Sequence, residues 1–280
     1  MATYHERPTI RTALHIDEAY FMRQNFSGIL EEMTIDDVRA LAPNVAVIPI
    51  GSTEPHGPAL PYGTDSFQVE YVAYGGTRKA NELDGRVLCL PTQRMSLNNN
   101  FRAFPFACRM QVPTFMNLLK DLVAMCRAEN VHRIIFINGH GGNPDVIRAT
   151  QRDLAAQDNL FTCLISTGSC ASEDAKAIWE NRSDHAGEEE TSQIMFLRPE
   201  LVRENLIANN PPQYPKLKTL REFDIDFVRP WHLYLPASAG GDARKASAQK
   251  GETVLNSAVE GTGRFLAELS QAEDSETFPY

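Results

Sequence analysis

The chain has 280 residues, 42% of them hydrophobic and 22% charged, so it is long enough for one large α/β domain or two small ones. Its net charge of −9 and the lack of a basic cluster argue against nucleic acid as a partner. The longest apolar runs, such as VAVIPI and IIFI, are too short to cross a membrane, and the N-terminal stretch lacks the apolar segment of a signal peptide, so we expect a cytoplasmic protein with no membrane partner.

Short runs of β-branched residues alternate with helical patterns along the chain. Ahead of the first strand, Thr34 can cap a helix over residues 35–42. Four runs have the composition of buried strands: Val45–Ile50, 86–91, Arg133–Asn138 and 161–167. Helices are expected around them, at 66–79, from Pro113 onward with a clear apolar stripe, from Pro144 onward, at Glu188–Leu197 and at 252–269.

This alternation with short links predicts an α/β protein, with a three-layer α/β/α fold around a mostly parallel sheet. No internal repeat or low-complexity linker divides the chain, so we expect a single domain over residues 1–280. A Pro-rich stretch and the sequence after it, at about 209–245, predict a long irregular excursion rather than a domain boundary. The five cysteines have no CxxC spacing and lie mostly in apolar or helical patterns, so we expect free thiols.

Polar segments follow the predicted strands. In open α/β sheets, ligands bind beyond the carboxyl ends of the strands. Glu54 and His56 come just after the strand at Val45–Ile50, and His140 comes just after the strand at Arg133–Asn138. A third polar segment, 183–192, follows the region after the fourth strand. Parallel strands would bring all three segments to one edge of the sheet.

These three segments share side chains of the kind that bind divalent metals. They supply imidazoles and carboxylates, and the candidates are Glu54, His56, Asp65, His140, Asp184, His185 and Glu190. Taken singly, each segment has an ordinary interpretation: a solvated turn, a loop histidine before two glycines, or an acidic first turn of a helix. Their occurrence at successive strand ends favours a metal site, and the absence of thiolates from the set argues against a structural zinc site.

Three stretches, IPIGSTEPHGPALPYGTD, INGHGGN and DHAGEEETS, resemble in order and spacing the signature segments of the creatininase (creatinine amidohydrolase) family. The resemblance runs from about residue 45 to about residue 251 and implies a creatininase-like fold with a dinuclear metal centre. It implies that one metal is held by Glu54, Asp65 and His140 and the second by His56, Asp65 and Glu190, with Asp65 bridging. Glu190 takes this place because creatininase itself has a glutamate where this chain has Gly142.

This ligand set predicts a hydrolase that cleaves a C–N bond of a small cyclic or linear amide, with a metal-bridging hydroxide as the nucleophile. His185 is expected to shuttle the proton, because imidazole titrates near neutral pH, and Asp184 to orient His185 or bind substrate. Two divalent ions per chain are expected, and Zn, Mn and Fe all accept such ligands. Two alternatives stay open: a ring-opening hydrolase, isomerase or lyase acting on a keto-cyclitol or sugar-derived substrate, and a non-catalytic metal-binding subunit.

The segment between the first two signatures departs from the family at positions expected to form the pocket for a small-molecule substrate. Asn100 stands where a histidine is usual, and Arg109 introduces a guanidinium that could clamp a carboxylate or phosphate, or form a salt bridge at the surface or a subunit interface. The amide of Gly141 could face a substrate oxygen. Trp179 and Trp231 are candidates for a lid, with core or interface packing as the alternative. The resemblance also implies a homo-oligomer, often a hexamer.

Overall fold

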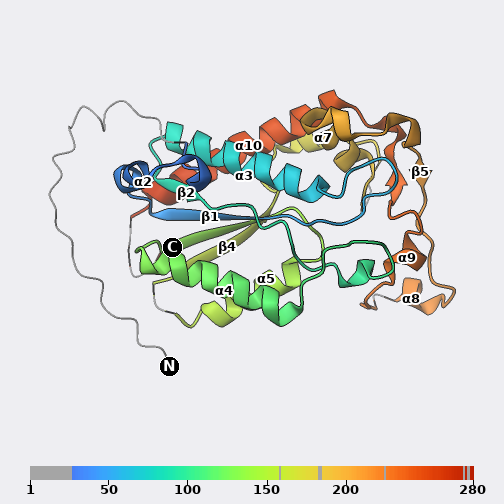
Figure 1. Ribbon diagram of the computed structural model, residues 1–280, viewed down its shortest axis with the longest axis horizontal. Helices are drawn as coiled ribbons and strands as arrows, with labels where there is room; N and C mark the ends of the chain where they lie inside the picture. Colours follow the sequence, from blue (N-terminus) through green and yellow to red (C-terminus); the bar gives the residue numbers. More distant parts are fainter. Residues whose placement is uncertain (1–26, 158, 182–184, 224, 274, 276–277) are drawn as a thin grey trace.

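The computed structural model describes residues 27–280, with gaps at 158, 182–184, 224, 274 and 276–277 (Figure 1). Within the described residues, four parallel strands form a sheet in the order β2–β1–β3–β4. The strands are β1 (Val45–Ile50), β2 (Val87–Cys89), β3 (Arg133–Asn138) and β4 (Phe161–Ser166). Their pairing aligns Ile50, Asn138 and Ser166, so β1, β3 and β4 end at the same level.

Helices cover both faces of this sheet (Figure 1). On one face lie α3 (Thr64–Glu82) and α10 (Ala248–Gln271), and on the other lie α4 (Val112–Ala128) and α5 (Pro144–Leu154). A further helix, α7 (Glu188–Leu197), packs against α10 and α3. The predicted three-layer α/β/α fold with a mostly parallel sheet is therefore confirmed.

Alternation along β1 explains why the core has two sides. Val45 and Val47 pack in one cluster with α3 and α10, whereas Ile48 and Ile50 pack in another with α4 and α5. Successive strand residues point to opposite faces, so a strand covered on both sides must be apolar throughout. All six residues of β1 are buried, as the continuous apolar run predicted.

Caps explain where two of the helices begin. The first, α2 (Ile35–Leu41), has the predicted Thr34 cap, which forms a full capping box. The last helix begins at Ala248 rather than at residue 252, because the Ser247 side chain accepts a hydrogen bond from Lys250 N. Elsewhere α3 begins slightly earlier than expected, and β2 is shorter than the predicted run.

The expected excursion at about 209–245 lies beyond the carboxyl ends of the strands, at the right of Figure 1. It contains the short elements β5 (Asn209–Asn210), α8 (Thr219–Glu222), α9 (Trp231–Tyr234) and β6 (Gly241–Asp242), and it is followed by a 3-10 turn at Ala243–Lys245. Antiparallel pairing of β5 with β6 joins its two ends. Other short elements are α6 (Glu173–Lys176) and the 3-10 turns Leu30–Glu32, Asn99–Phe101, Pro199–Leu201 and Glu204–Leu206.

All five cysteines lie in the described part of the chain and are free thiols, as expected. Burial raises the pKa of the Cys126 thiol to about 11, which keeps it protonated and unreactive. None of the helices in the described ranges is long and apolar enough to span a bilayer.

Candidate metal centre

The predicted metal-binding side chains meet at the carboxyl edge of the sheet. Glu54 and His56 lie in the loop after β1, and Asp65 lies in the first turn of α3. His140 follows β3, and Glu190 lies in the first turn of α7. The first four are buried, while the Glu190 side chain keeps 22% of its surface exposed. Residues far apart in the sequence thus share one largely buried site.

The ligand atoms form two groups that share Asp65. His140 Nδ1 lies 3.1 Å from Glu54 Oε2 and 3.2 Å from Asp65 Oδ2. His56 Nε2 lies 3.0 Å from Asp65 Oδ1 and 3.6 Å from Glu190 Oε2. Within each group, the three ligand atoms lie within 4.8 Å of one another, which is close enough to surround one ion. The structure therefore brings together the same two sets of side chains that the resemblance implies.

Backbone carbonyl groups orient the imidazoles of His56 and His140. His56 Nδ1 lies 3.0 Å from Glu54 O. Likewise, His140 Nε2 lies 2.9 Å from Leu97 O. A carbonyl oxygen only accepts hydrogen bonds, so in the neutral rings these nitrogens carry the protons and the opposite nitrogens keep lone pairs that face the carboxylates. Metal-bound histidines usually have this arrangement.

Two buried atoms at the centre, His56 Nε2 and Asp65 Oδ2, make no hydrogen bond within the part of the chain that the structure describes. Both atoms lie at ion-pair distance from a neighbour but lack hydrogen-bond geometry, and because buried polar atoms without a hydrogen bond cost free energy, their presence suggests a ligand. Burial opposes a charge on His56, but the Asp65 and Glu190 carboxylates outweigh it and raise the pKa of His56 to about 10. A proton thus balances the carboxylates when no cation does, and a divalent ion would take its place. The donor set fits such an ion.

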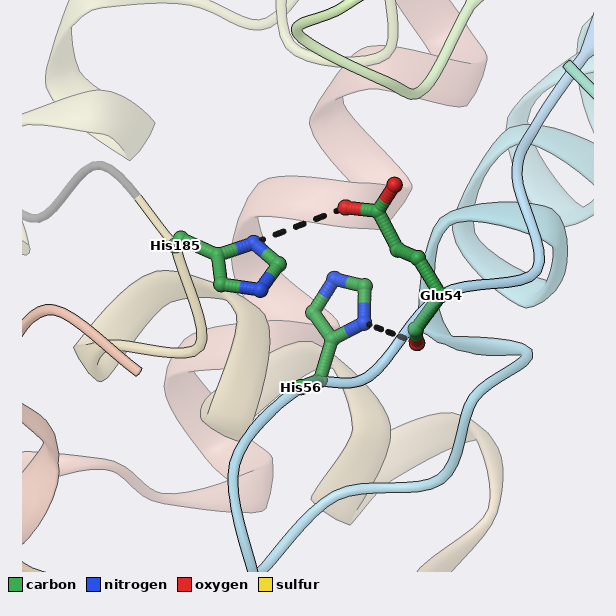
Figure 2. A group of neighbouring side chains, drawn as sticks. All are labelled: Glu54, His56 and His185. Carbon is green, nitrogen blue, oxygen red and sulfur yellow. Dashed lines mark hydrogen bonds and ion pairs between the residues drawn. The ribbon is translucent and has the colours of Figure 1, made fainter. Parts of the chain in front are cut away.

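His185 lies beside Glu54 and His56, as Figure 2 shows. Its Nε2–H donates to Pro55 O at 2.8 Å, which leaves the lone pair of Nδ1 at 3.7 Å from Glu54 Oε1. Burial, together with the neighbouring His56, lowers the pKa of His185 to about 4. The ring is therefore uncharged at neutral pH and can accept a proton at Nδ1. Asp184, predicted to orient His185 or bind substrate, lies outside the described residues.

A third group of possible ligand atoms comes from Glu54, His56 and His185. The geometry therefore allows two uses of the His185 ring, as a metal ligand or as a carrier of protons beside the other two groups. The sequence placed His185 among the candidate metal-binding side chains, and the family resemblance then favoured the second use.

Two buried side chains that the sequence analysis did not single out support Glu54. Ser52 Oγ donates to Glu54 Oε2 at 3.0 Å, and Asn98 Nδ2 donates to Ser52 Oγ at 2.7 Å. Asn98 Nδ2 also donates to Cys108 O at 2.9 Å. Ser52 and Asn98 are 46 residues apart in the sequence, and although Ser52 lies within the first signature stretch, nothing local to either residue indicates that the two meet.

Glu188, in the acidic first turn of α7, forms a buried ion pair rather than facing solvent. Lys250 Nζ lies 2.6 Å from Glu188 Oε1 and 2.8 Å from Glu180 Oε1. The backbone N–H of Asn181 donates to Glu188 Oε2 at 2.7 Å. These contacts tie the start of α10 to the chain on either side of His185, and so they help to hold that residue in place.

The candidate ligands other than His56 line a cavity of about 360 Å³, which we call the metal cavity. Asn100 and Gly141, both predicted to contact substrate, are among its lining residues. Arg109 is not among the described lining residues: its backbone pairs with that of Ser96, and its side chain is exposed. The arginine that lines the cavity is instead Arg229 of the excursion, whose guanidinium lies over the Tyr234 ring, so the expected role of Arg109 finds no support at this cavity.

The two candidate lid residues lie in different places. Trp231 lines the metal cavity, where its ring stacks on Phe101 with centroids 4.8 Å apart and meets His185 edge-on at 5.2 Å. Trp179 packs against a core cluster that includes Val72 and Leu255. Trp231 is therefore placed to shield the metal cavity from water, whereas Trp179 takes the alternative role in core packing.

Known proteins resemble this chain over most of its length. The family described as Creatininase, creatinine amidohydrolase, matches residues 31–266. The mycofactocin precursor peptide peptidase of Mycobacterium ulcerans (strain Agy99) is 27% identical over 272 residues, covering 92% of this chain and 98% of that protein. The creatinine amidohydrolase of Pseudomonas putida is 23% identical over 248 residues, covering 80% of this chain and 89% of that protein.

Structural comparison agrees with the sequence comparison. A crystal structure from Bacteroides fragilis NCTC 9343, assigned as a creatinine amidohydrolase, superposes with a TM-score of 0.80 at 26% identity. The superposition covers 90% of this chain and 100% of that chain. The relatives are named as a peptidase and an amidohydrolase, both of them hydrolases. The chain is therefore a hydrolase that belongs to the creatininase family.

Proposed function

We propose that the protein is a metal-dependent amidohydrolase that cleaves the C–N bond of a small cyclic or linear amide. The observation that carries this proposal is the pair of three-residue groups that share Asp65, with imidazole lone pairs directed at carboxylates. Divalent ions held side by side in this way lower the pKa of a water molecule and polarise a carbonyl oxygen.

In this proposal each group holds one ion. Glu54 and His140 complete the first group with Asp65, and His56 and Glu190 complete the second. Two imidazoles and three carboxylates suit Zn, Mn or Fe, because all of these ions accept mixed nitrogen and oxygen ligands.

His185 is assigned the proton transfer. Its Nδ1 faces the ligand cluster, while the hydrogen bond from Nε2 to Pro55 O keeps the ring in this orientation. The ring accepts a proton at Nδ1 and passes it to the leaving nitrogen, and the Pro55 carbonyl stabilises the charged form meanwhile. Phe101 and Trp231 flank the imidazole and limit the access of bulk water.

The names of the relatives point to two kinds of amide. One relative is named a precursor peptide peptidase and the other a creatinine amidohydrolase. Identity and coverage are both higher for the peptidase, which favours a linear amide as the substrate of this chain. We also propose that the protein is a homo-oligomer, on the ground of the family resemblance.

Metal analysis followed by turnover assays tests the proposal. We expect purified protein to contain up to two divalent ions per chain, and Asp65→Asn to lose most of them. Asp145→Asn is the matched control, because its carboxylate is 99% exposed on α5. Lactams, formamides, short peptides and keto-cyclitols are then screened by mass spectrometry. A product that has gained no water would favour the isomerase or lyase alternative, and metal-free protein with full activity would refute the proposal.

A further inference from the structure

A second and larger cavity lies next to the metal cavity. It has a volume of about 800 Å³ and is lined by residues of the excursion between 213 and 234, so we call it the apolar cavity. Arg229 lines both cavities, so they adjoin at this residue. In Figure 1 the helices α8 and α9 mark its position beyond the carboxyl ends of the strands.

The short helix α9 contributes different residues to the two cavities. Its first residue, Trp231, lines the metal cavity, whereas Leu233 and Tyr234 line the apolar cavity. Large apolar side chains that remain exposed are concentrated here, and those that line the cavity are Tyr214, Phe223, Ile225, Phe227 and Leu233. Apolar surface left in contact with water at one place usually marks a binding site.

The excursion is anchored to the catalytic region near its end, and a hydrogen bond within the excursion holds its first part to α9. Gly240 N donates to His185 O at 2.7 Å, and Ser238 Oγ donates to Pro55 O at 2.8 Å. Near the start, Gln213 N donates to Tyr234 O at 2.8 Å. The apolar cavity is therefore held at a defined position relative to the candidate ligands.

We propose that the apolar cavity binds a bulky apolar or aromatic part of the substrate, while the amide bond to be cleaved lies in the metal cavity. This inference rests on the proposed amidohydrolase function and deepens it, since it assigns the substrate to extended apolar amides. The two cavities adjoin at Arg229, and hydrogen bonds to His185 O and Pro55 O fix the excursion beside the candidate ligands, which favours substrate over other occupants. A second copy of the chain is the competing occupant, and the experiment distinguishes the two.

Binding of acyl hydroxamates to the metal-loaded protein tests this proposal. The hydroxamate group chelates divalent ions, and its acyl chain can extend from the metal cavity toward the apolar cavity. Each fully buried methylene strengthens binding by about fourfold. We therefore expect the Kd from calorimetry to fall at least about tenfold between acetohydroxamate and octanohydroxamate, which allows for partial burial of the chain.

Two leucines of the excursion provide a matched pair of variants. Leu233 lines the apolar cavity and is 60% exposed, whereas Leu217 is 61% exposed and is not among the described lining residues. Leu233→Ser should reduce the gain from the longer chain to less than about threefold, while Leu217→Ser should keep it. Similar Kd values for the two hydroxamates in the unchanged protein, or an unreduced gain in Leu233→Ser, would overturn the proposal.

Light scattering on the same variants measures their oligomeric state and tests whether a second copy of the chain occupies the apolar cavity. If Leu233→Ser dissociates an oligomer and leaves the gain from the longer chain unchanged, the cavity is an interface between copies and the proposal is wrong. Failure of the proposed function has a different signature, because acetohydroxamate itself would then not bind. In that case both the proposed function and the assignment of the apolar cavity as a substrate site would be wrong.

Discussion

The support of Glu54 by Ser52 gives a prediction that can be worked through in detail. Ser52→Ala removes the hydroxyl that donates to Glu54 Oε2 at 3.0 Å. Ser52 is completely buried, so water does not readily replace the lost donor. Glu54 belongs to the group with Asp65 and His140 but not to the group with His56 and Glu190. The substitution should therefore weaken one of two ion-binding steps.

The size of the effect follows from similar contacts in other metal sites. Loss of a hydrogen bond to a metal ligand lowers metal affinity by roughly 10- to 100-fold. This corresponds to about 1.4 to 2.7 kcal/mol in binding free energy. The second step should change by less than about threefold, because no hydrogen bond of its own group is removed.

Titration with Zn²⁺ or Mn²⁺ against a competing chelator measures both steps. Ser66→Ala is the matched control, because Ser66 is also buried and its hydroxyl donates to Ser52 O rather than to a candidate ligand. We expect Ser66→Ala to leave both affinities close to those of the unchanged protein. The reasoning is refuted if Ser52→Ala binds both ions normally, or if the two variants weaken both steps alike.

Three further predictions concern the ligands, the proton carrier and the buried ion pair. Asp65→Asn should weaken both ion-binding steps, whereas His140→Ala should weaken one; equal effects in a chelator titration would argue against a shared carboxylate. His185→Gln should retain its metals and lower kcat by roughly 100-fold or more, and near-normal turnover would remove the proton-transfer role. Burial opposes the charge of Glu188, but hydrogen bonds, first from Lys250, hold its pKa below the ordinary value of 4.5. This pair therefore stabilises the fold above about pH 4.5, and its contribution is lost as the pH falls through the lower pKa of the folded state. Lys250→Met should lower the free energy of unfolding by about 3 kcal/mol near neutral pH. It should also make that free energy change less between neutral and acid pH. Urea unfolding at several pH values measures both, and an unchanged pH dependence would contradict this reasoning.

Local patterns were sufficient to predict the layers of the fold. The run Val45–Ile50 is apolar throughout because both faces of a central parallel strand are covered, and this constraint is visible in six residues. Thr34 marked the start of its helix because capping depends on neighbours in the sequence. Ser247 was missed, and with it the true start of α10, because a lone serine is a weaker signal than a periodic apolar stripe.

The candidate ligands could also be found from the sequence, since strand ends are local features and parallel strands place them at one edge. Glu54 and His56 follow β1, and His140 follows β3. The same rule could not say which atoms would face one another. That Asp65 lies within 3.2 Å of both His56 and His140 depends on how α3 packs against the sheet.

The sequence by itself therefore determined the strands, the helices and the residue types of the candidate centre, because each depends on neighbours along the chain. Only the tertiary structure decided which groups support the centre and which line its cavities. Arg229 lines the metal cavity and Arg109 does not, because the path of the excursion depends on contacts such as that of Gly240 with His185. Such contacts join distant segments through packing and hydrogen bonds, and no periodicity within either segment encodes them.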